Sequence, residues 1–226
     1  MALTPNLPDG PVLVVAPHPD DELIGCGGVL AAHRGRGDEV RVLVIFDGAL
    51  GDPERRFGTP AQCVERRVEE ARAGGRHLDL HDYVFLGLPE GHRASPGQLE
   101  TGAERIAAEA RRFGARCVYA PAKTDAHFDH HQTALAVELA LGRLGNEVEG
   151  WGFEVETPVR ADRMFAFDAF AERKWAALAE HASQTAYRDL VSASARTARL
   201  RASQLEGVEA VEAFQRLIAA TERQAG

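Results

Sequence analysis

The pattern of apolar and polar positions along the chain predicts strands that alternate with helices. Two short runs rich in valine and isoleucine, residues 12–16 and 39–46, are bounded by turn residues and are typical of buried strands. Between them, residues 21–36 carry apolar side chains at helical spacing and acidic side chains near the start, where they suit the helix dipole. These three segments predict one strand-helix-strand unit.

The same alternation continues through the rest of the chain. Further strands are predicted at residues 83–88, 116–120 and 151–156, and further helices at residues 59–78, at 98–113, from near His130, and from Phe170 onward. Strands that alternate with helices of this length predict an α/β fold, in which a mostly parallel sheet with right-handed crossovers is covered on both faces. No linker, repeat or low-complexity segment interrupts the pattern, so residues 1–226 are expected to form a single domain.

Composition and charge narrow the partners that the chain is expected to have. Acidic residues number 34 against 26 basic ones, and the resulting formal charge of -8 argues against nucleic acid and anionic lipid surfaces as partners. The chain has no apolar run of about 18 residues and no signal-like start, so neither a membrane span nor export is expected. Its three widely spaced cysteines predict neither a disulfide framework nor a CxxC metal site, and they suit a reducing cytoplasm.

The first polar stretch that suggests chemistry is Pro-His-Pro-Asp-Asp-Glu at residues 17–22, between the first strand and the first helix. Ligands of open parallel sheets gather at this edge. Asp20, Asp21 and Glu22 place three negative charges side by side, which calls for a cation. The alternative is structural, because acidic residues at a helix start more often cap the helix than bind a metal.

The second stretch, Asp-Ala-His-Phe-Asp-His-His at residues 125–131, follows the strand at 116–120 and precedes a helix. A parallel sheet would bring both stretches to one edge, although an isolated histidine is usually only a hydrogen-bonding residue. Imidazole and carboxylate ligands suit zinc, and three protein ligands leave one position open for water. The joint placement of the two stretches therefore favours a catalytic metal site.

With both stretches quoted, the chain resembles the PIG-L/LmbE family of zinc-dependent N-deacetylases, whose hallmark is a PHPDDE-like loop paired with a later HxDH. Weaker similarities extend over residues 46–51, 67–70, 153–158 and 174–184. The sequence departs from the family pattern at Phe46, Phe128 and Glu156, which puts the identity of the substrate in doubt more than the chemistry. The resemblance implies a Rossmann-like three-layer fold and leaves a homo-oligomer open, since members include assemblies as well as monomers.

The resemblance also implies a zinc ion held by three side chains, with water completing the site: His18, Asp21 and His130. Zinc lowers the pKa of bound water towards roughly 7 and polarises an amide carbonyl. Asp20 would accept the proton of the attacking water as general base. The implied substrate is a small N-acylated sugar, such as an N-acetylglucosamine derivative.

Three further residues receive roles from the same resemblance. A protonated His127 would stabilise the oxyanion and then protonate the departing amine, and Asp129 would orient His127. Arg67 would bind the substrate, with an ion pair to Glu70 as the structural alternative. Glu22 is expected to support or cap rather than to bind the metal.

Other functions remain open at this point. One is a metal-dependent amidase that acts on a thiol-sugar conjugate or a larger acyl group, and another is a metal-binding protein without catalysis. A phosphoesterase is less favoured, because two-metal sites usually need more ligands than this set offers. Asp20 and His127 favour catalysis, because neither is needed as a ligand.

Overall fold

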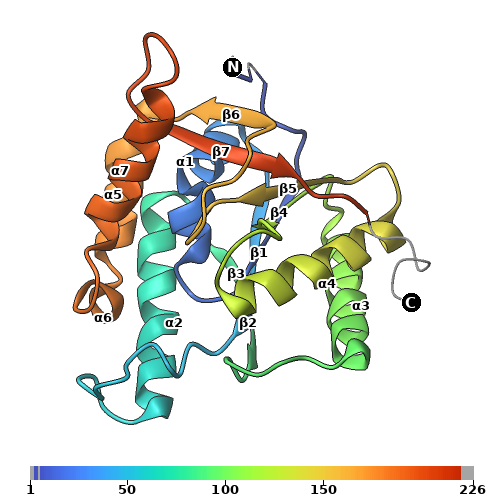
Figure 1. The fold of residues 1–226 in the computed structure, drawn as a ribbon, viewed down its shortest axis with the longest axis vertical. Coiled ribbons are helices and arrows are strands. Elements are labelled where there is room, and N and C mark those ends of the chain that lie inside the picture. Colours follow the sequence, from blue (N-terminus) through green and yellow to red (C-terminus); the bar gives the residue numbers. More distant parts are fainter. Residues whose placement is uncertain (1–2, 5, 220–226) are drawn as a thin grey trace.

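The computed structural model describes residues 3–4 and 6–219, which fold around one sheet with helices on both of its faces (Figure 1). The strand order is β3-β2-β1-β4-β5-β7-β6, and the first five of these strands are parallel. β7 runs antiparallel to both of its neighbours. The strands are β1 (Val12–Ala16), β2 (Val40–Phe46), β3 (Asp82–Leu88), β4 (Cys117–Pro121), β5 (Glu149–Phe153), β6 (Arg163–Ala166) and β7 (Val211–Arg216). The predicted α/β class with a mostly parallel sheet is confirmed.

The described helices are α1 (Asp21–Arg36), α2 (Pro60–His77), α3 (Pro96–Phe113), α4 (Phe128–Leu144), α5 (Ala171–Ala179), α6 (Ala182–Thr185) and α7 (Leu190–Ala202), with a 3-10 turn η1 (Asp168–Phe170). Four of the described helices, α2, α3, α4 and α7, begin at a side chain that caps them. The capping boxes of α2 and α3 are formed by Thr59 and Ser95, and a proline follows each of them in the first turn of the helix. Among the residues that the structure describes, no helix has the length and apolar character that crossing a membrane requires.

Two hydrophobic cores lie on the two faces of the sheet. Successive side chains of a strand point to opposite faces, so Val12 and Val14 of β1 join the core beneath α1, α2 and α5. Leu13 and Val15 join the core beneath α3 and α4. β1 and β4 are buried along their whole length, which explains their continuous apolar sequences.

The carboxyl-terminal third differs most from the sequence-based expectation. The strand predicted at 151–156 lies at Glu149–Phe153, and the helical region predicted from Phe170 onward contains separate helices and then a strand, β7. Neither β6 nor β7 was predicted. β6 has only four residues, and in β7 the buried Glu212 interrupts the apolar pattern that would have marked a core strand.

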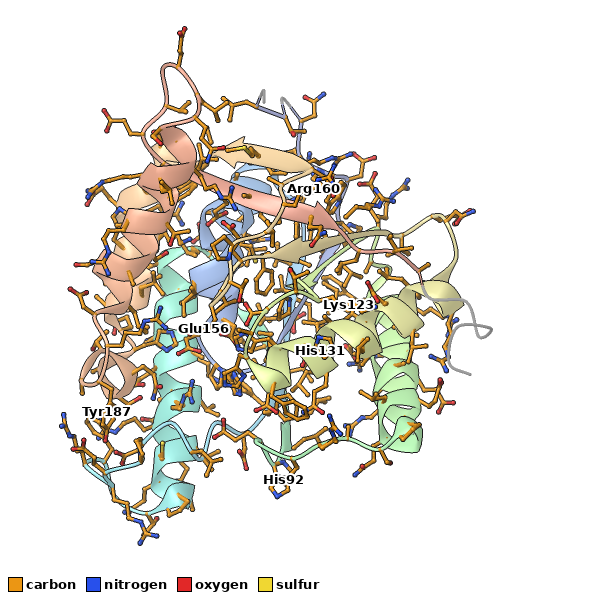
Figure 2. All side chains as sticks on the ribbon, in the orientation of Figure 1. His92, Lys123, His131, Glu156, Arg160 and Tyr187 are labelled. Carbon is orange, nitrogen blue, oxygen red and sulfur yellow. The ribbon has the colours of Figure 1, made fainter. Side chains whose placement is uncertain are left out.

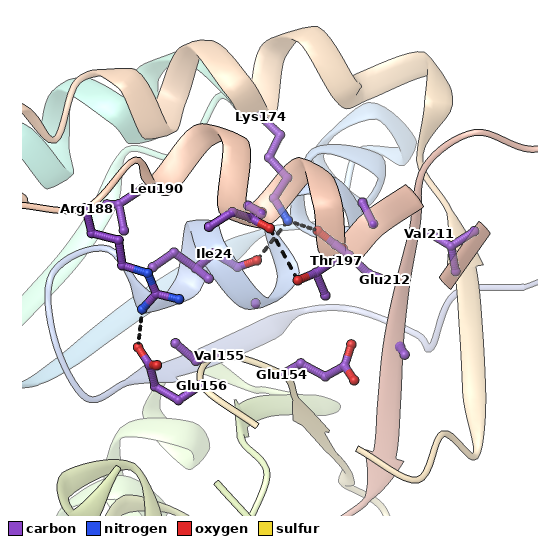
Figure 3. A pocket seen from close by; sticks show the side chains of 15 residues that line it. Ile24, Glu154, Val155, Glu156, Lys174, Arg188, Leu190, Thr197, Val211 and Glu212 are labelled. Atoms are coloured by element: carbon purple, nitrogen blue, oxygen red, sulfur yellow. Dashed lines mark hydrogen bonds and ion pairs between the residues drawn. The ribbon is translucent and has the colours of Figure 1, made fainter. Parts of the chain in front are cut away.

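Helix α1 is broken near its middle and is braced by residues from distant parts of the chain. Cys26 has non-helical torsion angles (φ -143°, ψ 16°). The carboxylate of Glu212 accepts the backbone N–H groups of residues 28 and 29, each at 2.8 Å, as a cap accepts them at a helix start. The ammonium of Lys174 donates to the carbonyl of Ile24 at 2.9 Å and to Glu212 at 2.7 Å (Figure 3). The part of α1 before the break is thereby fixed to α5, and the part after it to β7.

Candidate active site

The two chemistry-bearing stretches meet at the carboxyl edge of the sheet. β1 lies between β2 and β4, where the strand order reverses, and such a switch point is the usual ligand site of an open α/β sheet. The first stretch follows β1 and enters α1, and the second follows β4 and enters α4. A cavity of about 560 Å³ lies between them. All of the predicted site residues line it: His18, Asp20, Asp21, Arg67, His127, Asp129 and His130.

The three predicted metal ligands lie in contact with one another. Oδ2 of Asp21 is 3.2 Å from Nδ1 of His18 and 3.3 Å from Nε2 of His130. Two ligand atoms that share a tetrahedral zinc ion, each about 2.1 Å from it, lie roughly 3.4 Å apart. Each imidazole is therefore close to this spacing from Asp21, although no group of described ligand atoms that all lie within 4.8 Å of one another contains all three side chains.

The remaining ring nitrogens of both histidines face carboxylates. Nε2 of His18 is 3.3 Å from Asp129 and 3.2 Å from Glu90. Nδ1 of His130 is 3.2 Å from Asp125. Metal-binding histidines usually donate their second N–H to a carboxylate or carbonyl in this way, which fixes the ring and its tautomer. The arrangement leaves Nδ1 of His18 and Nε2 of His130 directed at the shared carboxylate.

Other groupings of possible ligands are present at the same place. Ring nitrogens of His18, His127 and His130 lie within 4.8 Å of one another, and so do donor atoms of His18, Glu90 and Asp129. Neither grouping contains Asp21. All of these donors are imidazoles and carboxylates, a set that suits zinc and other divalent transition metals.

Electrostatics at the cluster favour a bound cation. Burial would lower the pKa of His18, but the carboxylates of Asp129, Asp21 and Glu90 hold that pKa well above its usual value. Burial also acts to lower the pKa of His130, but the carboxylate of Asp21 outweighs it and raises that pKa to about 9. Burial would raise the pKa of Asp21, yet the two imidazoles hold it well below its usual value. A metal ion would replace the protons that these histidines otherwise carry.

Asp20 and Arg67 form a buried pair beside the cluster. Nη2 of Arg67 donates to Oδ1 of Asp20 at 3.2 Å, and Nη1 donates to the carbonyl of Gly48 at 3.2 Å. Burial raises the pKa of Asp20 to about 6, against the opposing effect of the guanidinium. The structural alternative for Arg67, an ion pair with Glu70, is wrong, because Glu70 instead accepts hydrogen bonds from Ser183.

The orientation of His127 differs from the expectation. His127 is the N-cap of α4, and its Nδ1 accepts the backbone N–H of Asp129 at 3.2 Å. The carboxylate of Asp129 lies against His18 and the backbone N–H of Gly91 instead. Asp129 therefore orients His127 through its backbone, not through its carboxylate. With Nδ1 accepting, the proton of a neutral His127 is on Nε2.

The prediction missed two carboxylates that contact the predicted ligands, and Glu22, which was expected to support the site or cap α1, does not cap that helix. Asp125 was part of the second stretch but received no role, and Glu90 follows β3, so its position after a parallel strand was the available signal. Glu22 accepts the hydroxyl of Tyr83 at 3.0 Å, and burial raises the pKa of Glu22 to about 8. His181 is completely buried, and burial lowers its pKa to about 3.

Two of the departures from the family pattern line this cavity, and the third, Phe46, lies beside His18. The ring of Phe46 lies 5.8 Å from that of His18, and Phe128 is exposed and lines the cavity. Glu156 lines it too and pairs with Arg188 at 2.6 Å. Figure 2 shows Glu156 and Tyr187, which both line the cavity, near the carboxyl-terminal helices. These side chains shape the mouth without replacing a ligand.

Comparison with known proteins places these observations in a family. A sequence model described as GlcNAc-PI de-N-acetylase, PIG-L, matches residues 13–141. The 2'-N-acetylparomamine deacetylase of Streptomyces fradiae is 36% identical over 155 residues, which are 62% of this chain and 55% of that protein. A 1D-myo-inositol 2-acetamido-2-deoxy-alpha-D-glucopyranoside deacetylase of Kineococcus radiotolerans is 35% identical over 83 residues, 35% of this chain and 23% of that protein. The matched segments thus span about half or less of these curated relatives.

Solved structures share the fold over nearly the whole chain. A conserved protein from Thermus thermophilus is 28% identical with a TM-score of 0.74, and the match covers 97% of this chain and 99% of that one. The N,N'-diacetylchitobiose deacetylase of Pyrococcus horikoshii is 19% identical with a TM-score of 0.79, covering 92% of this chain and 84% of that one. A 4-carboxy-2-hydroxymuconate hydratase from Pseudomonas putida is 22% identical with a TM-score of 0.76, covering 93% and 97%. Because one fold carries both activities, the reaction has to be argued from the site.

Proposed function

Because the chain belongs to the GlcNAc-PI de-N-acetylase (PIG-L) family, we propose that it removes an N-acetyl group from a small amino-sugar derivative by zinc-assisted hydrolysis. The observation that carries the proposal is the meeting of His18, Asp21 and His130 in one cavity with Asp20 beside them. The products are acetate and a free amine.

His18, Asp21 and His130 would hold the metal, and Asp125, Asp129 and Glu90 would hold the two imidazoles in place. When bound, zinc supplies a Lewis acid for the amide carbonyl and a water of lowered pKa. The chain's own contribution is rigidity: the ligands and their carboxylate partners are buried, so little reorganisation accompanies binding.

Asp20 acts as the general base in this proposal. Its pKa of about 6 leaves most of the carboxyl ionised at neutral pH while keeping it basic enough to accept a proton. Arg67 holds one of its oxygens, which directs the carboxylate within the cavity. His127 donates a hydrogen bond from Nε2 to the developing oxyanion, because Nδ1 accepts the backbone N–H of Asp129 and burial lowers the pKa of the ring. The proton that Asp20 accepts from the attacking water then passes to the departing amine.

Support for a sugar substrate comes from the names of the relatives and from the size of the cavity. The curated relatives are named as deacetylases of acetylated paromamine and of a glucosaminyl inositol. A cavity of about 560 Å³ lies within the roughly 300–1,000 Å³ that small-molecule sites occupy. A reducing compartment such as the cytoplasm is part of the proposal, because the three cysteines are free and buried.

The decisive experiment is an acetate-release screen over N-acetylated sugars, with metal content measured on the same preparations. We expect about one zinc per chain and acetate release from an N-acetylglucosamine derivative. Asp20→Asn should keep the metal and lose a hundredfold or more of the activity, an order of magnitude typical of a lost general base (~10²–10⁴).

The matched control is Asp9→Asn, which changes an exposed aspartate before β1. It should retain both metal and activity. Full turnover by Asp20→Asn would remove Asp20 from the mechanism. Metal-free protein that still releases acetate would overturn the zinc-assisted reaction itself.

A further inference from the structure

A second cavity, of about 460 Å³, opens between the β2–β3 end of the sheet and the helices α3 and α4. It shares no lining residue with the cavity that holds the imidazole cluster. Its walls are largely apolar and include Ile45, Phe46, Leu86, Leu99 and Ile106. Small-molecule sites have this size and are lined mainly by apolar side chains with a few polar groups.

The cavity exists because two helices cannot cover this face of the sheet. α4 packs on β4 and β5, while α3 packs on α4 and β1. Two helices, each about 10 Å wide, cover about four strands spaced about 4.8 Å apart, so the β2–β3 end remains open. Gly102 of α3 widens the gap, since a Cβ there would meet its nearest atom, Cβ of Ala136, only at 3.9 Å.

The polar groups of the cavity favour an anion. Arg93, Arg105 and His92 line it, and none of the described carboxylates does, although the chain as a whole carries a formal charge of -8. Neither arginine forms an ion pair within the part of the chain that the structure describes. Thr133 also lines the cavity, and its buried hydroxyl has no hydrogen-bond partner among the described residues. A buried polar group of this kind is costly unless a ligand satisfies it.

We propose that this cavity binds a small amphipathic carboxylate, with its apolar body on the walls and its carboxylate facing Arg93 and Arg105. One water molecule takes up about 30 Å³ of liquid, so the cavity has room for roughly fifteen groups of that size. A saturated carboxylate of about ten carbons fits this space. The occupant lies close to the catalytic cluster. The ring of Phe46, which lines the cavity, is 5.8 Å from that of His18, and Gln132 lines it while donating to Asp129 at 2.8 Å.

Calorimetric titration of the full chain with sodium decanoate, below its micelle concentration, tests the proposal. We expect saturable binding of one decanoate per chain. Decyltrimethylammonium, which has the same chain and the opposite charge, should bind about tenfold more weakly or worse, the loss that follows one charge-assisted hydrogen bond. Absence of saturable binding, or equal affinity for both head groups, overturns the proposal. Binding is read without turnover, so the result does not depend on the proposed deacetylase activity.

Two variants locate the bound molecule. Gly102→Leu projects a side chain into the cavity and should weaken decanoate binding at least about tenfold. Gly97→Leu is the matched control, because it adds the same side chain to α3 at an open position outside the cavity, and its affinity should equal that of the wild type. Wild-type affinity in Gly102→Leu places decanoate elsewhere and overturns the site.

The double variant Arg93→Ala/Arg105→Ala tests the charge independently of packing. Both side chains are exposed, so the fold does not depend on them. We expect the affinity for decanoate to fall to that for decyltrimethylammonium. Retained discrimination between the two head groups overturns the anion assignment, and thermal unfolding of every variant verifies that it is folded.

Discussion

Replacing Lys174 with methionine should destabilise the protein more than any change to a surface charge. Lys174 is one of only two lysines in the chain, and its side chain is 2% exposed. It pairs with Glu212, whose side chain is 4% exposed and whose carboxylate also caps the second half of α1. Lys174→Met would leave that carboxylate buried without its cation.

The expected cost follows from the burial of the pair. Removing one partner of a buried ion pair costs about 3–5 kcal/mol, because the other charge is left uncompensated. For a domain of this length, each kcal/mol shifts the melting temperature by roughly 2–4 °C, so the variant should melt about 6–20 °C lower. Circular dichroism during heating, together with urea unfolding, measures both quantities.

The second lysine provides a matched control. Lys123 pairs with Glu138 at 2.9 Å, but its side chain is 48% exposed. Lys123→Met should therefore change the free energy of unfolding by about 1 kcal/mol or less. Lys174→Met/Glu212→Gln, in which neither charge remains, should recover part of the loss. If Lys174→Met were no less stable than Lys123→Met, the brace across α1 would have no energetic role.

Two further predictions concern the site and its surroundings. Asp125→Asn should weaken zinc binding by about 10-fold to 100-fold, because the carboxylate of Asp125 holds Nδ1 of His130. Competition with a chelating dye measures the affinity, and an unchanged affinity would contradict the support role of Asp125. Burial lowers the pKa of His181 to about 3, below the unfolded value of about 6.5, so the unfolded state binds the extra proton and stability is lost as pH falls from 6.5 towards 3. Between pH 6.5 and pH 5 the expected loss in the free energy of unfolding is about 2 kcal/mol. Urea unfolding at these two pH values should show this loss in the wild type but not in His181→Leu. An equal loss in the wild type and the variant would contradict the prediction.

The parallel half of the fold could be predicted from the sequence because its central strands are buried on both faces. β1 is a continuous apolar run and β2 is interrupted only by Arg41, and turn residues and caps mark the helices between the strands. The antiparallel extension was not predictable in the same way. In β7 the buried carboxylate of Glu212 accepts hydrogen bonds from backbone N–H groups far away in sequence. The local sequence around Glu212 cannot predict these partners.

The sequence predicted which residues line the candidate site, but not which of them contact each other. Two polar stretches at the ends of two parallel strands are sufficient to predict that His18 and His130 meet. Which carboxylate faces which imidazole depends on side-chain direction at the start of α4. That direction turns Asp129 towards His18 and leaves the backbone N–H for His127.

The order of strands in the sheet has a consequence for how the protein is completed during synthesis. β7 lies between β5 and β6, although it is the last of the described strands in the chain and so leaves the ribosome after them. Until it emerges, β6 has no neighbour in the sheet, and the break in α1 lacks its acidic cap. The nascent chain therefore carries both candidate metal-binding stretches before the break in α1 is capped, and a truncated translation product that ends before residue 211 would contain every proposed site residue on an unfinished scaffold.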